Sequence, residues 1–329
     1  WAYDQIIQGI HDGKIKGLWM IATNAAHSWI NQKSFTDAVK KLEFFVVQDM
    51  YPTTETARLA HLYLPAAAWG EKQGSFINAE RRIGVSRKVS RAPGQALADF
   101  SIFRLIAEAW GCGDLFQRWT SQEDVFKILA EVSRGQPCDI SGIESYDMIE
   151  RNGGIQWPHP AGVPEAVLRR AERRLFADGQ FYTPDKRARF VYEAPAELPE
   201  KPDAEYPLLL LTGRGSSAQW HTETRTKKSA VLRKLYADRL YLEINPRDAE
   251  KLALQDGQQV SVATRRGAVE AWARITTTVA AGQIYLPMHD SRVNLLTLGV
   301  FDPHSRQPGY KACAARVESL AAQALLHHP

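Results

Sequence analysis

Tyr206-Pro-Leu-Leu-Leu-Leu-Thr-Gly-Arg-Gly-Ser-Ser-Ala-Gln-Trp-His-Thr-Glu-Thr-Arg-Thr226 is the stretch of sequence that says most about this chain. Its apolar first part, Tyr206 to Leu211, predicts a strand, and its second part, Thr212 to Thr226, predicts a loop rich in glycines, hydroxyls and cationic side chains. Backbone N–H groups freed by the glycines can approach phosphate oxygens closely, and Arg214 offers a planar fork for two of them. The stretch is therefore typical of a site for a large phosphorylated cofactor; the alternative is an ordinary polar loop.

The sequence around this stretch predicts a small β-barrel. Apolar and polar residues alternate at Val260 and Val262 and again from Val269 to Ile275, as in half-buried strands, and Asp256-Gly257 and Arg266-Gly267 supply turns. Asn245-Pro246 predicts the start of a short helix, because proline suits the first helical position. A second polar segment, His289 to Lys311, follows, so we expect the barrel to present two polar loops.

The N-terminal part alternates between helical and strand patterns. In order these are a helical face at Ile6, Ile7 and Ile10, an apolar strand from Gly17 to Ala22, a helix from Phe35 to Leu42 and a strand from Glu43 to Val47. Such alternation predicts right-handed βαβ units and a parallel sheet. Ligands bind beyond the carboxyl ends of such strands, where Asn24 and Gln48-Asp49 are expected.

Packing helices and a long crossover are expected between these two parts. Helical spacing from Ile102 to Trp110 ends at Gly111, and a further helix is predicted from Val125 to Val132. The following segment, Gly153 to Pro207, is rich in prolines and charges, which is typical of a surface crossover. We therefore predict a parallel-sheet α/β domain over residues 1–152, a crossover linker over residues 153–205 and a C-terminal β-barrel domain over residues 206–329.

Composition narrows the possible function classes. The chain has 329 residues, enough for two domains with separate cores, and a net charge of +4 whose basic residues are scattered, which argues against nucleic-acid binding. Its longest apolar runs are far below the ~20 residues that cross a bilayer, so no membrane insertion is expected. Three widely spaced cysteines predict neither a disulfide framework nor a metal site. Because the chain begins at Trp1 inside a helical pattern, we expect a fragment.

Three ionisable residues each have two interpretations. Asp49 could cap the next helix, or Thr53 or Thr54 could do so and leave Asp49 to accept guanine N–H groups or ribose hydroxyls. Asp99 precedes a predicted helix, a position typical of an N-cap. Lys72 is typical of a solvated lysine, although glycines on both sides would allow its loop to close on a ligand.

Other polar residues favour structural roles. His289 resembles a catalytic base, but no nucleophile or second ligand accompanies it, so a hydrogen-bonded structural histidine is expected. An internal ion-pair cluster is expected for Glu80, Arg81 and Arg82. No G-x-S-x-G elbow occurs, which argues against a serine hydrolase.

Several motifs occur in the order and spacing of a known family. They are Pro52-Thr-Thr-Glu-Thr-Ala57, Leu64-Pro65, Trp69-Gly-Glu-Lys-Gln-Gly74, Asn78-Ala-Glu-Arg-Arg82, Ala92-Pro-Gly94, Asp99, Gly153-Gly-Ile-Gln-Trp-Pro158, Thr212-Gly-Arg214, Gln219-Trp-His-Thr222, Asn294, Phe301-Asp-Pro303 and Tyr310-Lys311. Through them nearly the whole chain resembles the molybdopterin oxidoreductases of the DMSO reductase superfamily. It is most similar to the C-terminal part of nitrate reductase catalytic subunits of the assimilatory or periplasmic type.

The resemblance implies a cofactor, Mo-bis(molybdopterin guanine dinucleotide), and the residues that hold it. In the α/β part these would be Asn24, Gln48, Asp49, Lys72 and Asp99. In the barrel, implied to be of the double-psi type, they would be Thr212, Gly213, Arg214, Gln219, His221, Thr222, Asn294 and Lys311. Met288 matches a position that lines the substrate approach, where relatives often carry an aromatic residue.

The resemblance also implies an activity for the intact enzyme. Nitrate would be reduced to nitrite in the cytoplasm or periplasm, with electrons from a ferredoxin or from a flavoprotein or reductase subunit. The family's N-terminal part, with its [4Fe-4S] cysteine motif and molybdenum-ligating cysteine, is not in this sequence, so the chain alone is expected to be inactive. The alternatives are a formate dehydrogenase or other oxyanion reductase of the superfamily, and a non-catalytic nucleotide-binding barrel module.

Overall fold

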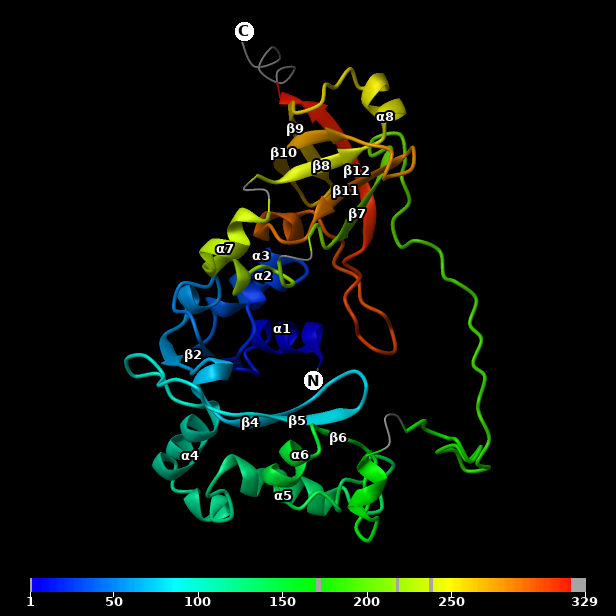
Figure 1. Cartoon of the computed structure of the whole chain (residues 1–329). Helices are drawn as coiled ribbons and strands as arrows, with labels where there is room; N and C mark the ends of the chain where they lie inside the picture. Colours follow the sequence, from blue (N-terminus) through cyan, green and yellow to red (C-terminus); the bar gives the residue numbers. More distant parts are fainter. Residues whose placement is uncertain (1, 170–172, 217–218, 237–238, 321–329) are drawn as a thin grey trace. The chain divides into compact units, whose positions relative to one another are not determined.

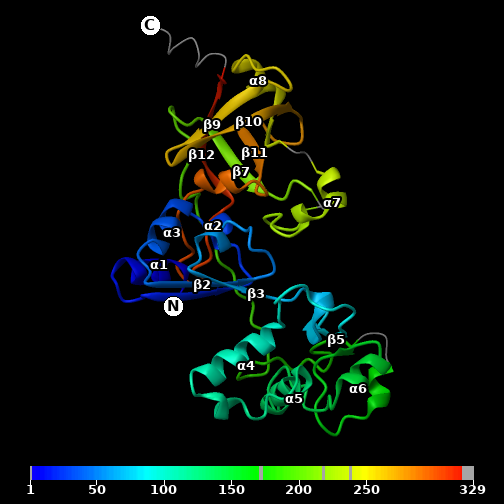
Figure 2. The same cartoon turned by 90° about the vertical axis from the view of Figure 1, so that its left-hand side faces the viewer.

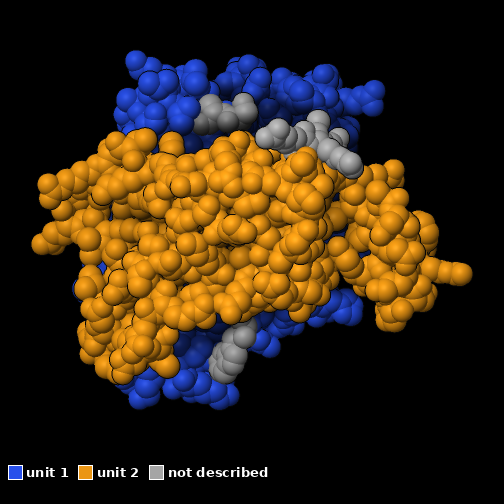
Figure 3. All heavy atoms as spheres, turned by 60° about the horizontal axis from the view of Figure 1, so that its bottom comes forward, with its two compact units in different colours: residues 1–64, 195–329 blue, residues 65–194 orange. Residues whose placement is uncertain are grey.

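The computed structural model describes residues 2–169, 173–216, 219–236 and 239–320. The chain forms two compact units: unit 1 comprises residues 1–64 and 195–329, and unit 2 comprises residues 65–194 (Figure 3). Unit 1 is therefore discontinuous in sequence, because the α/β start of the chain packs with the C-terminal barrel, whereas the sequence predicted consecutive segments. Among the described helices, none is both long and apolar enough to cross a membrane.

Unit 1 begins with a small parallel sheet. Its elements are α1 Tyr3–His11, β1 Gly17–Ile21, α2 Ala25–Ser28, α3 Gln32–Val39, β2 Phe44–Asp49, η1 Ala57–Leu59 and β3 Leu62–Pro65 (Figure 1). Strands β1 and β2 pair in parallel, with Gly17 opposite Phe44 and Ile21 opposite Gln48, in a sheet of order β1-β2-β3. This confirms the predicted parallel sheet and places the carboxyl ends of β1 and β2 at one edge.

The helices between β1 and β2 differ from the prediction. Helix α3 begins at Gln32 rather than Phe35, because Asn31 is its N-cap and accepts a hydrogen bond from the Ser34 N–H at 3.4 Å. Helix α2 was not predicted, since four residues are too few to show a periodic pattern. Asn24 is the N-cap position of α2, directly beyond β1.

The C-terminal part of unit 1 is a closed barrel. In the described part of the chain six strands form it, in the order β10-β8-β11-β7-β12-β9. The elements are β7 Leu208–Gly213, η5 Thr226–Lys228, α7 Ala230–Lys234, β8 Tyr241–Ile244, α8 Pro246–Lys251, β9 Gln259–Thr264, β10 Gly267–Ile275, β11 Gln283–Pro287, η6 Ser291–Leu295 and β12 Ala312–Ser319 (Figures 1 and 2). Strand β7 is parallel to β11, and β8 is parallel to β10, while the other neighbours are antiparallel. The barrel confirms the predicted C-terminal β domain.

The alternating pattern correctly identified the inward side chains of the barrel. Val262, Val269 and Ala271 are all buried in its core. Two boundaries were wrong. Strand β7 starts at Leu208 rather than Tyr206, and the turn between β9 and β10 is residues 265–266, because Gly267 already pairs with Thr264.

The segment that enters the barrel is bound to it by Glu200. This carboxylate accepts hydrogen bonds from both terminal nitrogens of Arg266, each at 2.9 Å, and from the Ala314 N–H at 2.9 Å. Arg265 adds a third cationic contact at 3.2 Å. Glu200 therefore ties residues 195–205 to the β9–β10 turn and to β12.

Unit 2 combines an antiparallel sheet with helices. Its elements are η2 Trp69–Glu71, β4 Gly74–Ile77, β5 Arg82–Ser86, α4 Asp99–Ala109, η3 Gly113–Phe116, α5 Gln122–Val132, α6 Tyr146–Arg151, β6 Ile155–Gln156 and η4 Glu165–Arg169. The sheet order is β4-β5-β6, and Ile83, Tyr146 and Ile155 share its core. Within the predicted crossover, β6 and η4 are regular structure, while residues 173–205 contain no helix or strand.

The expected ion-pair cluster of unit 2 is a different arrangement. Arg81 donates to the backbone carbonyls of Trp157 and Arg173, and Arg82 donates to the Gly154 carbonyl at 3.0 Å. These guanidinium groups therefore have the structural role that was predicted, but they satisfy carbonyls rather than the Glu80 carboxylate.

Candidate functional site

Two polar loops leave the barrel at the same end. Strands β7 and β11 are parallel neighbours, with Gly213 opposite Pro287, so the segments that follow them start side by side (Figure 1). The Met288 N–H donates to the Gly213 carbonyl at 2.8 Å, and the Thr212 hydroxyl donates to the Tyr310 carbonyl at 2.7 Å. The loops after β7 and β11, which the sequence singled out separately, therefore form one surface.

His289 fastens these loops together. Its side chain is fully buried, its Nε2 accepts the Gly215 N–H at 3.1 Å, and its Nδ1 donates to the His221 carbonyl. An N–H donor from Gly215 requires a lone pair on Nε2, so the ring is neutral with its proton on Nδ1. Both nitrogens are occupied, which agrees with the structural role expected for His289. The Gly215 N–H was expected to face phosphate, but it donates to His289 Nε2 instead.

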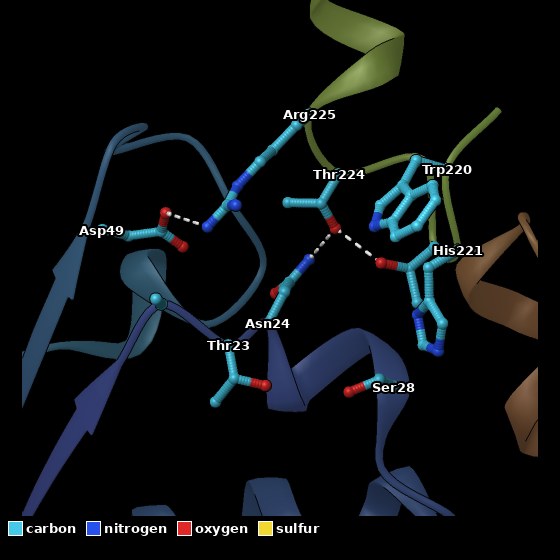
Figure 4. Close-up of a pocket in the computed structure, with 10 residues that line it drawn as sticks. Thr23, Asn24, Ser28, Asp49, Trp220, His221, Thr224 and Arg225 are labelled. Carbon is cyan, nitrogen blue, oxygen red and sulfur yellow. Dashed lines mark hydrogen bonds and ion pairs between the residues drawn. The ribbon is translucent and has the colours of Figure 1, made fainter. Parts of the chain in front are cut away.

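The loop after β7 also reaches the α/β layer, through Asn24. The Asn24 Nδ2 donates to Glu55 Oε2 at 2.6 Å and to Thr224 Oγ1 at 2.8 Å. Its Oδ1 accepts the Thr56 N–H at 3.1 Å and the Thr56 hydroxyl at 2.8 Å. Figure 4 shows Asn24 pointing from the start of α2 toward Thr224. Because both its donors and both its lone pairs are used, Asn24 shapes the wall of the site.

Asp49 faces the same space from the end of β2. Its side chain is only 3% exposed, its Oδ1 accepts the Met50 N–H at 2.7 Å, and Arg225 Nη2 lies 3.8 Å from the same oxygen (Figure 4). Thr54, rather than Asp49, accepts the Ala57 N–H at 3.1 Å where η1 begins. Of the two interpretations of Asp49, the capping one is therefore wrong.

These residues line two adjoining pockets. The first, of about 170 Å³, is drawn in Figure 4 and is lined by Ala22, Thr23, Asn24, Ser28, Asp49, Trp220, His221, Thr222, Thr224 and Arg225. The second, of about 250 Å³, shares Thr222 and Thr224 and is also lined by His27, Thr53, Thr54, Glu55, Glu223, Lys227, Lys228, His289, Asp290, Ser291 and Arg292. Since drug-sized ligands usually occupy ~300–1,000 Å³, each pocket suits one part of a larger ligand.

The second pocket is suited to an anion. His27 is buried, and its Nε2 has no hydrogen-bond partner among the described residues. Burial lowers the pKa of His27, against the attraction of Glu55 and Asp290, so the ring is neutral at pH 7. Lys227 and Lys228 are exposed at this pocket, which is also lined by three carboxylates. Lys227 pairs with Glu223 at 2.8 Å, and Arg292 pairs with Asp290 at 2.7 Å. A neutral imidazole and two ammonium groups are donors that anionic oxygens bind well.

Three predicted site residues are buried or hydrogen-bonded within the fold and line neither of these two pockets. Gln48 is fully buried in β2. Gln219 donates to the Leu232 carbonyl at 3.2 Å and accepts the Thr226 hydroxyl at 2.5 Å. Asn294 donates to the His27 carbonyl at 2.8 Å and so joins η6 to α2. None of the three lines either pocket; they hold the elements that do.

Other predicted residues lie near the first pocket. Thr222 lines both pockets and shares a hydrogen bond with Thr224 at 2.8 Å. Arg214 lies over the Trp220 ring, 5.0 Å from its centroid. Burial, followed by the charges of Arg214 and Lys311, lowers the pKa of His221. Both cations therefore lie within electrostatic reach of His221.

The remaining candidates are Met288, which is half-buried, and the pair Lys72 and Asp99. Lys72 and Asp99 belong to unit 2, where they form an ion pair with side chains 30% and 27% exposed. Lys72 is therefore not simply solvated. Asp99 is the first residue of α4, with Ala98 at the N-cap, so its predicted capping role was wrong.

Sequence reasoning missed several pocket residues. His27 and Ser28 lie on α2, which no periodic pattern revealed. Glu55 falls inside the motif from Pro52 to Ala57, and Thr224 inside the loop after β7, but nothing in their local sequence indicates that Asn24 joins them. The sequence signal available for Glu55 and Thr224 was therefore their position inside these two segments.

Two family descriptions match this chain. Residues 2–109 match "Molybdopterin oxidoreductase", and residues 208–314 match "Molydopterin dinucleotide binding domain", which spans the barrel and both polar loops. The chain belongs to the molybdopterin oxidoreductases. The family inferred from the motif order is thereby confirmed, and the two pockets lie in unit 1 and are lined by residues from both matched regions.

Curated relatives of this molybdopterin oxidoreductase include two kinds of enzyme. It is 34% identical over 318 residues to the assimilatory nitrate reductase catalytic subunit of Bacillus subtilis, covering 95% of this chain and 43% of the relative. It is also 34% identical over 313 residues to the F420-dependent formate dehydrogenase 1 subunit alpha of Methanococcus maripaludis, covering 93% and 44%. The chain therefore spans less than half the length of these relatives.

The fold is similar to that of a solved structure. Acetylene hydratase from Pelobacter acetylenicus superposes with a TM-score of 0.74 at 17% identity, covering 95% of this chain and 46% of that chain. At this level of identity the likeness concerns the fold.

Proposed function

We propose that this chain is the cofactor-holding C-terminal part of a molybdenum nitrate reductase catalytic subunit, and that it binds Mo-bis(molybdopterin guanine dinucleotide). The observation that supports the proposal is the buried Asp49 carboxylate, which faces one pocket while the second pocket, with Lys227 and Lys228 in its lining, adjoins it. A carboxylate accepts the N1–H and 2-amino groups of guanine, and cations attract a diphosphate. The two pockets thus provide for both ends of a guanine nucleotide.

Individual side chains in unit 1 fit such a ligand. Thr23 and Ser28 line the first pocket with Asp49, and their hydroxyls can bond a ribose there (Figure 4). His27 lines the second pocket with Lys227 and Lys228, and the two exposed ammonium groups can bond phosphate oxygens. From the resemblance alone, we also assign cofactor contacts to Lys72, Asp99, Arg214 and Lys311.

The protein's contribution to the reaction is to hold and orient this cofactor. When bound, the cofactor supplies the oxygen-atom transfer that converts nitrate to nitrite. Residues of this chain hold its nucleotide end through Asp49 and through Lys227 and Lys228 of the second pocket. His289 and Asn24 hold the backbone of both loops in place, so that these contacts are formed before the cofactor arrives.

Formate oxidation is the second candidate. Its support is the 34% identity to a formate dehydrogenase alpha subunit, the same as to the nitrate reductase. We favour nitrate because the ensemble of motifs resembles nitrate reductases. In either case a separate protein, such as a ferredoxin or a flavoprotein, would exchange electrons with the enzyme, and we propose a cytoplasmic location.

The test uses the complete protein that contains this chain, purified from a molybdate-supplied host. We expect it to contain molybdenum and guanine nucleotide and to form nitrite from nitrate with a reduced dye as donor. Dye reduction by formate without nitrite formation would replace nitrate with formate. Absence of molybdenum and guanine nucleotide from folded protein would overturn the cofactor proposal.

Asp49→Asn in the same protein tests the role proposed for the Asp49 carboxylate. The amide retains the size of the side chain but loses the charge and one acceptor, so we expect molybdenum content to fall at least about tenfold. Asp256→Asn, at a turn on the barrel, is the matched control and should retain it. Equal molybdenum contents in the two variants would remove Asp49 from the cofactor site.

A further inference from the structure

Arg225 and Asp49 face each other across the first pocket. Arg225 Nη2 lies 3.8 Å from Asp49 Oδ1, with the arginine side chain 46% exposed and the aspartate 3% exposed. Figure 4 shows the guanidinium turned toward the carboxylate and away from Trp220 and His221. The carboxylate is buried and accepts the Met50 N–H at 2.7 Å, whereas the arginine side chain is half-exposed.

The guanidinium group and guanine present the same donors to a carboxylate. A guanidinium offers a planar pair of N–H groups, and guanine offers N1–H and its 2-amino group in the same planar arrangement. One carboxylate accepts only one such pair in this geometry. A guanine base that pairs with both oxygens of Asp49 uses Oδ1, the oxygen that faces Arg225, and so competes with Arg225 for it.

A displaced Arg225 has a new partner close by. It follows Thr224, which lines both pockets, and it precedes Lys227 and Lys228 of the second pocket. A phosphate bound there accepts two parallel hydrogen bonds from a guanidinium, and such charge-assisted bonds are stronger than an ion pair at 3.8 Å. The long, half-exposed side chain can turn between the two positions without a change in the backbone.

We propose that Arg225 is an exchangeable arm that competes with guanine for Asp49 and, once displaced, binds the phosphates of the same nucleotide. The proposal rests on the proposed function and refines its nucleotide selectivity. Ligands that offer guanine without phosphate lose to Arg225, while a phosphorylated guanine nucleotide displaces Arg225 and gains it as a partner. The site thereby selects the intact nucleotide over the free base or nucleoside.

The test is a binding titration of the purified chain, with calorimetry for GDP and ADP and proton NMR for the weaker ligand guanosine. The variants are Arg225→Gln, Asp49→Asn and, as a matched control, Arg247→Gln, which removes one exposed arginine from α8. Thermal unfolding of each variant verifies that it is folded.

We expect opposite effects of Arg225→Gln on the two guanine ligands. Guanosine should bind about two- to fivefold more tightly, because the weak Arg225 ion pair that opposes it is removed. GDP should bind about tenfold or more weakly, because a charge-assisted phosphate contact is lost. Arg247→Gln should leave both affinities unchanged.

Two other results would overturn the proposal, and they are distinguishable. If the wild-type chain prefers GDP to ADP through Asp49 but Arg225→Gln fails to strengthen guanosine binding, the exchange is wrong and the cofactor site stands. If GDP binds no better than ADP, or Asp49→Asn leaves the preference intact, guanine does not pair with Asp49 and both proposals fail.

Discussion

At the scale of single residues, the buried side chains that hold the loops of the site are neutral, and the charged side chains are exposed. His289, Asn24 and Gln219 are buried and neutral, and their polar atoms are bonded to the protein itself. The ionic groups Arg225 and Lys227 are exposed beside them. Buried polar groups are stable only when they are hydrogen-bonded, so this inner layer fixes the loops whose outer charges can meet a ligand.

His289→Ala tests the inner layer. The substitution leaves the Gly215 N–H and the His221 carbonyl without their partner, so we expect the free energy of unfolding to fall by about 2–3 kcal/mol. Urea denaturation measures this change. His304→Ala removes an exposed histidine from the same polar segment and is the control. Equal stability of the two variants would show that His289 does not hold the loops.

Gly215→Ala tests how tightly the loop after β7 is packed. An added Cβ would lie 2.5 Å from the Tyr241 hydroxyl and 2.7 Å from Pro287 Cβ, closer than atoms normally approach. We expect a loss of about 1–3 kcal/mol in unfolding free energy, measured by the same denaturation, because the neighbours must shift. Gly17→Ala, whose Cβ would have only one contact at 3.8 Å, should have little effect by comparison. A neutral Gly215→Ala would mean that this loop accommodates the methyl group.

At the scale of elements, parallel pairing decides where the loops meet. The parallel pair β1–β2 places Asn24 and Asp49 at one edge, and the parallel pair β7–β11 places the two polar loops at one barrel end. Both are consequences of strand direction, since parallel neighbours have their carboxyl ends together. Glu200 then attaches residues 195–205 to the barrel, at the turn between β9 and β10 and at β12.

Glu200→Gln tests the attachment of residues 195–205 to the barrel, and its effect on stability should depend on pH. The Arg266 hydrogen bonds hold the pKa of Glu200 below its usual range, so the carboxylate stabilises the fold above the unfolded pKa of about 4.3. That stabilisation disappears as the pH falls through the lower folded pKa. We expect Glu200→Gln to cost about 1–2 kcal/mol at pH 7 and progressively less below pH ~4.

Denaturation series at several pH values measure the effect of Glu200→Gln. The control is Glu197→Gln, which removes a carboxylate that is 82% exposed and paired only with Lys201 among the described residues. A stability difference for Glu200→Gln that stays constant from pH 7 to strongly acidic pH would contradict the assigned role of the charge.

At the scale of the whole molecule, the chain order and the compact units do not coincide. Residues 1–64 belong with the barrel through contacts that include Gln32 to the Ser291 carbonyl at 2.7 Å and Tyr310 to the Ser28 carbonyl at 2.8 Å. Asp4 and Arg306 add an ion pair. The candidate pockets lie within this unit, so they depend on segments from opposite ends of the chain.

Cleavage of the connecting segment tests this organisation. Phe190, Val191 and Tyr192 are 82–96% exposed, so a specific protease site can replace residues 188–193. After cleavage we expect both pieces to elute together in native size-exclusion chromatography, because unit 1 holds them. The same sample in urea should separate and serves as the control. Separation without urea would show that residues 1–64 and the barrel are not one stable unit.

The local structure and the family of this chain could be predicted from the sequence alone. Alternation identified the inward face of β9 and β10, Asn245-Pro246 marked the start of α8, and the ordered motifs identified a molybdopterin oxidoreductase. These features depend on neighbouring residues or on linear order, which the sequence contains in full. By contrast, α2 is too short for any period, and the capping roles of Asp49 and Asp99 were wrong because other residues provide those caps.

Only the tertiary structure decided which polar groups face a ligand. Asn24 and Thr224 are 200 residues apart in sequence, and their hydrogen bond depends on two parallel strand pairs that meet at one face. The same holds for the Gly215 N–H taken by His289 and for the Asp49 carboxylate shared with Arg225. A residue's type sets which bonds it can form, but its availability depends on which distant partners folding places beside it.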